Sequence, residues 1–449
     1  MPRAHRRHAR AVLFLLPLLT ACSRRDGPPS DAEGTPAWNV VLLSIDTLRA
    51  DHLGAYGATG GHSPRLDAFA ATGVVFEQAI AQAPWTLPSH ASMLASEYPS
   101  ALDVGTYSAP RPVHENARLL GEVLRDEGYR TYAVTGGGYV SSTFGLDQGF
   151  EAFEERLART DADRMFGIGT AWLDGLGDAG PFFLFLHTFE VHAYDPPEEI
   201  LRELWADGAP ESPLRRKKEL AKYLQTARNH AEIEAFTAED WRCAIDRYDG
   251  ALRSVDRAFG AFLDGLEERG LLEETLIVVT SDHGEEHGEH GAAGHGYNLH
   301  DENVRVPLLV GHPDLPTRRV GTQVRLLDVA PTVVDLLGIE PPEEWKGTTL
   351  VPAIAGEELS LKAFSESAHV DLKALRDGDL KYVLSLWERR EHLYDLEYDP
   401  VERIDLGADR PDDLASRRAA MALFVRETAS VERYRGGADA VLSEEKQRE

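Results

Sequence analysis

The chain has 449 residues, of which 43% are hydrophobic and 27% charged, and its formal net charge is -28. This length and composition predict a globular protein with one large α/β domain and a smaller appended unit. Nucleic acids are bound by clusters of Lys and Arg, so the acidic balance argues against a nucleic-acid partner. An anionic substrate would need a local positive centre, for which a bound divalent cation is the simplest candidate.

The first residues predict export and lipid anchoring. Several arginines precede the apolar run 11–19, which is too short to span a bilayer. The sequence Leu-Thr-Ala-Cys that ends at Cys22 resembles a bacterial lipoprotein signal. We therefore expect a signal peptide over residues 1–21, a lipid anchor on Cys22 and a flexible tether over residues 22–37. The expected location is the bacterial cell envelope, on the periplasmic side or the cell surface. An ordinary signal peptide that ends in Cys is the alternative.

Apolar runs alternate with helical patterns in the next part of the chain. Residues 39–45 form a near-continuous apolar run, which is typical of a strand buried on both faces of a parallel sheet. Strands alternating with helices predict a doubly wound sheet, with ligands at the carboxyl ends of its strands. The Lys- and Arg-rich stretch 209–229 breaks this pattern and is interpreted as a lid or an insertion. Further strands are expected at 130–134, 182–186 and 275–279, and helices at 63–71, 116–127 and 239–268.

The composition changes again towards the C-terminus. Residues 381–386 read as a strand, residues 393–400 are rich in turn formers, and residues 411–431 form a helical pattern. We expect residues 346–449 to form a small C-terminal subdomain with antiparallel strands and a closing helix, followed by a tail.

Polar side chains follow two of the predicted buried strands. Asp46 ends the first strand, and Asp282 and His283 end the strand at 275–279, directly before Gly284, which permits a sharp turn. A lone Asp at a strand end is more often a helix cap. Two carboxylates and an imidazole together are plausible ligands for one divalent cation, with Ca, Mn and Zn as candidates.

A third polar segment surrounds Thr86. Pro88 is expected at a first helical position, which places Thr86 and the following amides at the positive end of a helix, where an anion is favoured. A threonine hydroxyl is a weak nucleophile, but contact with a cation lowers its pKa. From this segment alone Thr86 is either such a nucleophile or merely the N-cap of the helix.

These segments resemble the motifs of the sulfatase family, within the alkaline-phosphatase-like superfamily. The resemblance implies a three-layer sandwich with a mostly parallel central sheet over residues 38–345 and a small C-terminal α+β subdomain. It also implies that Asp46, Asp282, His283 and Thr86 contact the metal, and that His192 and His295 lie near the leaving group. His187 is a weaker candidate for that role. The matching segments, in the order found in the family, are 41–57, 86–90, 281–285, 288–291, 305–310, 327–332 and 393–396.

Departures from the family pattern change the expected chemistry. Thr86 stands where sulfatases carry the Cys or Ser that is oxidised to formylglycine, so no formylglycine is expected. His90 replaces the Arg that ends the signature and is included among the candidate catalytic residues. Thr47 replaces an acidic ligand, and the segment 135–140, where the family has a Lys and a His, is uncharged. A threonine nucleophile occurs in related phosphodiesterases and phosphoethanolamine transferases, so the chemistry favours phosphorus.

The expected function is therefore metal-dependent hydrolysis of an anionic sulfate or phosphate ester, with phosphodiester chemistry favoured. Thr86 would attack the ester while His192 or His295 assists the leaving group. The substrate would carry a glycan or a lipid head group. Two alternatives remain open: a phosphoethanolamine- or glycerophosphate-type transferase, and a non-catalytic binding protein that retains the sulfatase fold.

Overall fold

The computed structural model describes residues 38–155, 162–177, 180–227 and 231–429, and a compact unit begins at Trp38. The predicted signal peptide, Cys22 and the tether lie outside the described residues, so they stay predictions. No helix in the described ranges is long and apolar enough to cross a membrane.

Nine strands form the central sheet of the described part of the chain. β1 (Asn39–Ile45) is flanked by β7 (Phe182–Thr188) and β8 (Thr275–Thr280) and is parallel to both. The order is β12-β2-β11-β8-β1-β7-β5-β6, and β13 pairs with β2. Because β11 runs antiparallel to its two neighbours, the sheet is mixed but mostly parallel. The remaining strands are β2 (Val74–Ile80), β5 (Arg130–Val134), β6 (Ala152–Glu154), β11 (Arg305–Gly311), β12 (Arg318–Val320) and β13 (Val324–Arg325).

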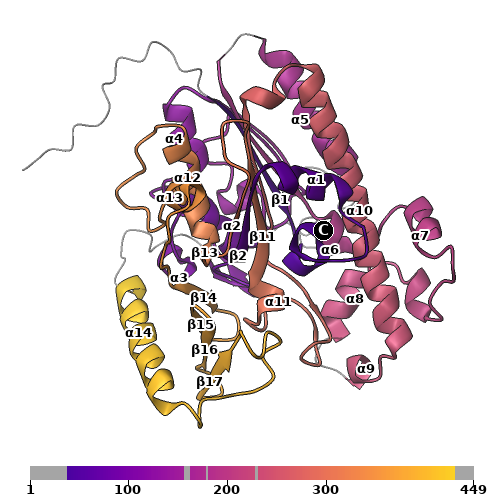
Figure 1. Ribbon diagram of the computed structural model, residues 1–449, viewed down its shortest axis with the longest axis vertical. Coiled ribbons are helices and arrows are strands. Elements are labelled where there is room, and N and C mark those ends of the chain that lie inside the picture. Colours follow the sequence, from indigo (N-terminus) through magenta and orange to yellow (C-terminus); the bar gives the residue numbers. More distant parts are fainter. Residues whose placement is uncertain (1–37, 156–161, 178–179, 228–230, 430–449) are drawn as a thin grey trace, which may run out of the picture. The chain divides into compact units, whose positions relative to one another are not determined.

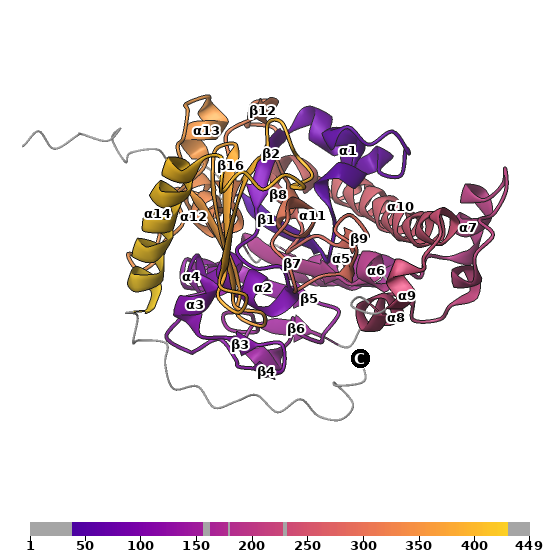
Figure 2. The same ribbon diagram turned by 90° about the horizontal axis from the view of Figure 1, so that it is seen from below.

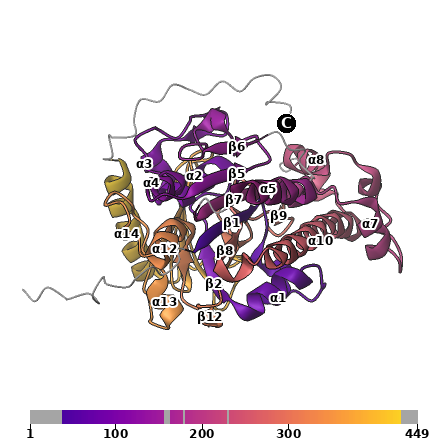
Figure 3. The same cartoon turned by 90° about the horizontal axis from the view of Figure 1, so that it is seen from above.

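β1 is buried on both faces because its side chains alternate between two hydrophobic clusters. Val40 and Leu42 belong to the cluster shared with α2, α4 and α12, whereas Val41 and Leu43 belong to the cluster shared with α1, α5 and α10. These helices cover the two faces of the sheet (Figure 3), which confirms the expected α/β sandwich. The helices are α1 (Pro64–Thr72), α2 (Thr86–Ala95), α4 (Leu120–Asp126), α5 (Ala162–Leu176), α10 (Ala238–Glu268) and α12 (Val329–Leu336).

The long helix α10 starts where its sequence provides a capping box. The side chain of Thr237 accepts a hydrogen bond from the amide of Asp240, and the Asp240 carboxylate accepts one from the amide of Thr237. The expected helix at 116–127 is shorter than predicted, because residues 114–117 form a turn in which the Ala117 amide donates to the carbonyl of His114, and Leu119 is extended before α4 begins.

The stretch 209–229, interpreted as a lid or an insertion, contains a short 3₁₀ helix and α8 (Leu220–Ala227). α8 packs against β10 (Ala293–Gly294) and against α6 (Glu190–Ala193). Its neighbours α7 (Glu198–Leu204) and α9 (Ala231–Glu234) lie beside the end of α10 (Figure 2). The insertion therefore brings a helix to the loops that follow β7 and β8.

The C-terminal strands form a separate antiparallel sheet, β14-β15-β16-β17, with α14 (Pro411–Ala429) beside it (Figure 1). This confirms the expected small α+β subdomain. Tyr382, Leu393 and Phe424 belong to the hydrophobic cluster between the sheet and α14. The strands are β14 (Ala363–Ser367), β15 (Leu372–Asp377), β16 (Leu380–Ser385) and β17 (Arg390–Asp395). Three short helices lie in the connections between other elements: α3 (Pro99–Leu102), α11 (Asp301–Val304) and α13 (Val351–Ala355).

A buried ion cluster joins the C-terminal sheet to α11, which directly precedes β11. Lys381, which is 1% exposed, donates to Asp301 at 2.9 Å and contacts Glu402 at 3.0 Å. Arg376 donates to the other oxygen of Asp301 at 2.6 Å. The two parts of the compact unit are thus fixed to each other by paired charges as well as by apolar packing.

Candidate active site

The carboxyl ends of β1 and β8 bring three predicted ligands together. Because the two strands are adjacent and parallel, Asp46 after β1 meets Asp282 and His283 after β8. One ligand atom of each residue lies within 4.8 Å of the others, and all three side chains are fully buried. His283 Nε2 lies 3.3 Å from Asp282 Oδ2 and 4.0 Å from Asp46 Oδ1.

The hydrogen bonding of His283 fits a metal ligand. Its Nδ1 lies 2.8 Å from the carbonyl oxygen of Gly284, which can only accept, so Nδ1 carries the proton. Nε2 then presents a lone pair to the two carboxylates of Asp46 and Asp282. Two negative charges and a lone pair that face one another in a dry site repel unless a cation lies between them. The donor set therefore suits one divalent cation with mixed oxygen and nitrogen ligands.

Thr86 is the first residue of α2, and its hydroxyl faces this group. The hydroxyl oxygen lies 3.4 Å from Asp46 Oδ2 and 3.5 Å from His283 Nε2, and the side chain is buried. The N-cap of α2 is Trp85, in an extended conformation. The alternative of Thr86 as N-cap is therefore wrong, and so is the expectation that Pro88 opens the helix, because Pro88 is its third residue.

Thr47 has a backbone conformation that favours glycine, with φ of 58°. In this conformation its amide donates to Asp282 Oδ1 at 3.3 Å, and its carbonyl accepts from the Tyr248 hydroxyl at 2.7 Å. The position that departs from the acidic pair of the family therefore orients Asp282 through its backbone.

His90 lies one helical turn beyond Thr86 and is fully buried. Its Nδ1 donates to the carbonyl of Thr86 at 2.9 Å, and Nε2 lies 2.9 Å from the Ser44 hydroxyl. Burial lowers the pKa of His90 to about 4, so the ring is neutral at pH 7. With both nitrogens engaged, His90 is placed to support the start of α2 and the base of the site.

His192 and His295 lie side by side near His283. The His295 ring centroid is 4.4 Å from that of His283 and 5.2 Å from that of His192. His295 Nδ1 contacts Glu285 Oε1 at 3.1 Å, and burial raises the pKa of Glu285 to about 8. The two candidate acids therefore lie next to each other, on the side of the site where His283 is.

Two further side chains contact the site, of which Gln225 was not selected from the sequence and His187 was only a weaker candidate. The Gln225 amide nitrogen, on α8, lies 3.4 Å from Nε2 of both His192 and His295. His187 Nε2, at the end of β7, lies 3.3 Å from Asp46 Oδ2, and burial lowers the pKa of His187 to about 4. His187 was the weaker candidate but ends a predicted buried strand, as Asp46 does. Nothing in the local sequence distinguishes Gln225.

The Sulfatase family model matches residues 38–339, and a model of the C-terminal part of N-sulphoglucosamine sulphohydrolase matches residues 288–415. The chain belongs to the sulfatase family. It is thus a member of a family of ester hydrolases, and its buried Asp46, Asp282 and His283 group is consistent with the metal site of that family.

The relatives of this sulfatase-family chain act on different esters. The Delta 4,5-hexuronate-2-O-sulfatase of Bacteroides thetaiotaomicron is 26% identical over 454 residues, covering 91% of this chain and 92% of that protein. The choline-sulfatase of Rhizobium meliloti is 26% identical over 434 residues, covering 83% of each chain. The crystal structure of the phosphonate monoester hydrolase of Agrobacterium radiobacter has a TM-score of 0.69 and 22% identity, covering 87% of this chain and 95% of that one.

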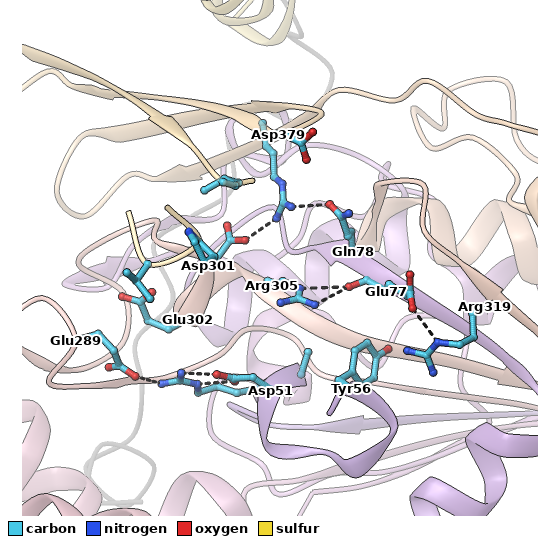
Figure 4. A pocket seen from close by; sticks show the side chains of 16 residues that line it. Asp51, Tyr56, Glu77, Gln78, Glu289, Asp301, Glu302, Arg305, Arg319 and Asp379 are labelled. Carbon is cyan, nitrogen blue, oxygen red and sulfur yellow. Dashed lines mark hydrogen bonds and ion pairs between the residues drawn. The ribbon is translucent and has the colours of Figure 1, made fainter. Parts of the chain in front are cut away.

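A charged cavity of about 400 Å³ lies elsewhere, between the start of β11 and the C-terminal sheet (Figure 4). Most of its charges are paired: Arg49 with Asp51 and Glu289, and Arg319 with Glu77. Arg49 also donates to the carbonyl of Glu285 at 3.0 Å. None of the three candidate metal ligands lines this cavity. Through its contacts with Glu285 and Glu289, Arg49 holds the loop after β8 in place.

Proposed function

We propose that this protein hydrolyses monoanionic phosphoryl esters, phosphodiesters above all, with Thr86 as the nucleophile. The observation that carries the proposal is the position of the Thr86 hydroxyl within 3.5 Å of both Asp46 and His283. A cation held by Asp46, Asp282 and His283 would lower the pKa of that hydroxyl and neutralise charge on the ester. Asp46 Oδ2 is the carboxylate oxygen that accepts the hydrogen bond of Thr86.

The residue type at position 86 supports phosphorus over sulfur. Formylglycine is an aldehyde, and oxidation of the secondary alcohol of threonine cannot produce one. Thr86 must therefore attack directly through its oxygen. In a phosphodiester, the Thr86 hydroxyl would give its proton to Asp46 Oδ2 as its oxygen bonds to phosphorus. The P–O bond to one ester oxygen would break, and that oxygen would leave with a proton from His295 or His192. Water would then cleave the phosphothreonine ester, release the monoester and restore the threonine.

The uncharged residues around the site favour a substrate with a single negative charge. The neutral His90 stands where the family signature ends in Arg, and the loop 135–140 is uncharged. A dianionic phosphate monoester needs more neutralising partners than a monoanionic ester does. The phosphonate monoester hydrolase of Agrobacterium radiobacter, which has the same fold, is named for a monoanionic ester of phosphorus.

Turnover of matched chromogenic esters tests the proposal. Purified protein loaded with Mn, Ca or Zn is assayed with bis(p-nitrophenyl) phosphate, p-nitrophenyl phosphate and p-nitrophenyl sulfate. We expect the diester to be preferred and Thr86→Ala to lose about 10³-fold or more in kcat. A phosphorylated Thr86 peptide should be detected after rapid acid quenching. A preference for the sulfate ester that survives in Thr86→Ala would overturn the mechanism.

We further propose that the enzyme acts at the cell envelope, held by a lipid on Cys22. The sequence Leu19-Thr20-Ala21-Cys22 supports this placement. Radiolabelled palmitate should enter the full-length protein in cells, and uptake of label by Cys22→Ala would contradict the anchor.

A further inference from the structure

A run of exposed cations lies on the insertion between β7 and α10. Five of the eight residues 215–222 are Lys or Arg, whereas acidic residues outnumber basic ones by 75 to 47 in the whole chain. All five cationic residues are exposed to solvent. We call this feature the basic surface, and it comprises Arg215, Arg216, Lys217, Lys218 and Lys222.

Neighbouring carboxylates leave most of the basic surface unneutralised. In the part of the chain that the structure describes, Lys222 alone of the five forms an ion pair, with Glu219 at 3.8 Å. The two side chains are 69% and 75% exposed, so this pair is screened by water and contributes little. The four consecutive cations 215–218 therefore keep a local positive charge that an external anionic surface can neutralise.

Two aromatic rings lie against these cations. The Arg215 guanidinium is 5.4 Å from the centre of the Trp205 ring, and the Lys217 ammonium is 3.9 Å from the centre of the Tyr223 ring. Both aromatic residues are half-buried. Half-buried Trp and Tyr beside Lys and Arg are typical of surfaces that rest at the boundary between lipid head groups and acyl chains. A soluble polyanion would need the cations but not the rings.

A buried arginine holds the backbone of the basic surface in place. Arg247 of α10 is 3% exposed, and its Nη1 donates to the carbonyls of Leu214 at 2.8 Å and Lys217 at 2.7 Å. Its Nε donates to the carbonyl of Tyr194, in the segment after β7, at 2.8 Å. Because the backbone is already fixed to α10, binding of a surface requires little further ordering.

The basic surface lies close to the two candidate acids of the active site. Lys222 and Gln225 are about one turn apart on α8, and the Gln225 amide nitrogen lies 3.4 Å from Nε2 of both His192 and His295. Figure 2 shows α7 and α8 on the side of the molecule away from α14. A surface that meets these cations would therefore approach the side of the site where the leaving group departs.

We propose that the basic surface docks the protein on a bilayer that contains anionic phospholipids. The two aromatic rings favour a bilayer over a soluble anionic polymer, and each Lys or Arg near an anionic bilayer strengthens the attraction. The docking goes beyond the reaction assigned to Thr86 and is independent of it. It is also independent of the predicted lipid on Cys22.

Flotation with lipid vesicles tests the docking. Full-length Cys22→Ala protein, which cannot carry the predicted lipid, is mixed with vesicles of phosphatidylcholine alone or of phosphatidylcholine and phosphatidylglycerol. We expect much stronger binding to the anionic vesicles, and loss of that difference at about 0.5 M NaCl, where charges are screened within a few ångströms. Gln at all four positions 215–218 should weaken binding to the anionic vesicles by about 100-fold.

A matched variant controls for net charge. It carries Lys346→Gln, Arg390→Gln, Arg403→Gln and Arg426→Gln, at four exposed residues elsewhere, and should bind as the parent does. Thermal unfolding checks that both variants are folded. Equal losses in the two variants, or binding that does not depend on phosphatidylglycerol, would overturn the proposal. Capture by dextran sulfate without binding to vesicles would also overturn it and would assign the basic surface to a soluble polyanion.

Discussion

His283 donates its Nδ1 proton to the carbonyl of Gly284 at 2.8 Å, which leaves its Nε2 lone pair directed at the carboxylates of Asp46 and Asp282. The hydrogen bond to the carbonyl of the next residue thus selects the tautomer of His283 that can bind a cation. The relationship ties the local backbone turn at Gly284 to the chemistry of the whole site.

Loss of one carboxylate should remove the metal. Asp282→Asn removes a charge from a fully buried group of three candidate ligands. We therefore expect the affinity for the metal to fall by about tenfold or more, and the bound metal to fall from about one per chain to near zero. Elemental analysis after gel filtration measures the content. Asp264→Asn, at a side chain that is 60% exposed, is the matched control and should keep the metal. Full metal retention in Asp282→Asn would exclude this group as the site.

Gln225 should act on the reaction through the histidines that it contacts. In Gln225→Ala the amide that lies 3.4 Å from both His192 and His295 is lost, so the two rings are less well positioned. We expect kcat for bis(p-nitrophenyl) phosphate to fall about tenfold with little change in KM, since the contact is not to substrate. Lys222→Ala on the same helix, at a side chain that is 69% exposed, is the control. Equal losses in the two variants would point to a general role of α8.

The buried ion cluster should dominate the attachment of the C-terminal sheet. Lys381→Met leaves Asp301 and Glu402 without their shared partner, and we expect the free energy of unfolding to drop by about 3 to 5 kcal/mol. Lys362→Met removes a more exposed partner of Asp377 and should cost less than about 1 kcal/mol. Urea unfolding measures both. Similar small losses would show that the apolar contacts hold the sheet by themselves.

Glu302 should make the fold less stable as the pH rises. Burial, with Glu402 and Glu289 nearby, raises its pKa from the ordinary 4.5 to about 8 in the folded state. The folded state therefore binds more protons than the unfolded state between pH 4.5 and 8. The contribution of protonated Glu302 to the free energy of unfolding is complete below pH 4.5 and is lost as the pH rises through 8. Glu302→Gln should flatten the decline between pH 5 and 8 in EDTA. An unchanged pH profile would contradict the raised pKa.

The sequence by itself determined the fold class and the three candidate metal ligands. Asp46, Asp282 and His283 were predictable because each follows a run of apolar residues that reads as a buried strand, and parallel strands deliver their carboxyl ends to one edge. The burial of β1 on both faces was likewise predictable, because its residues form a near-continuous apolar run. The motifs around Thr86 established the family, although they did not reveal that α2 begins at Thr86.

Only the tertiary structure decided what surrounds those residues. Gln225 meets His295 across 70 positions of the chain, and His369 lies between Tyr107 and Tyr297, which are 190 positions apart. Such contacts arise from how loops pack on the finished sheet, and no local period encodes them. The strand pattern therefore predicted the edge of the sheet where the candidate site lies, whereas the packing of distant loops decided which side chains surround it.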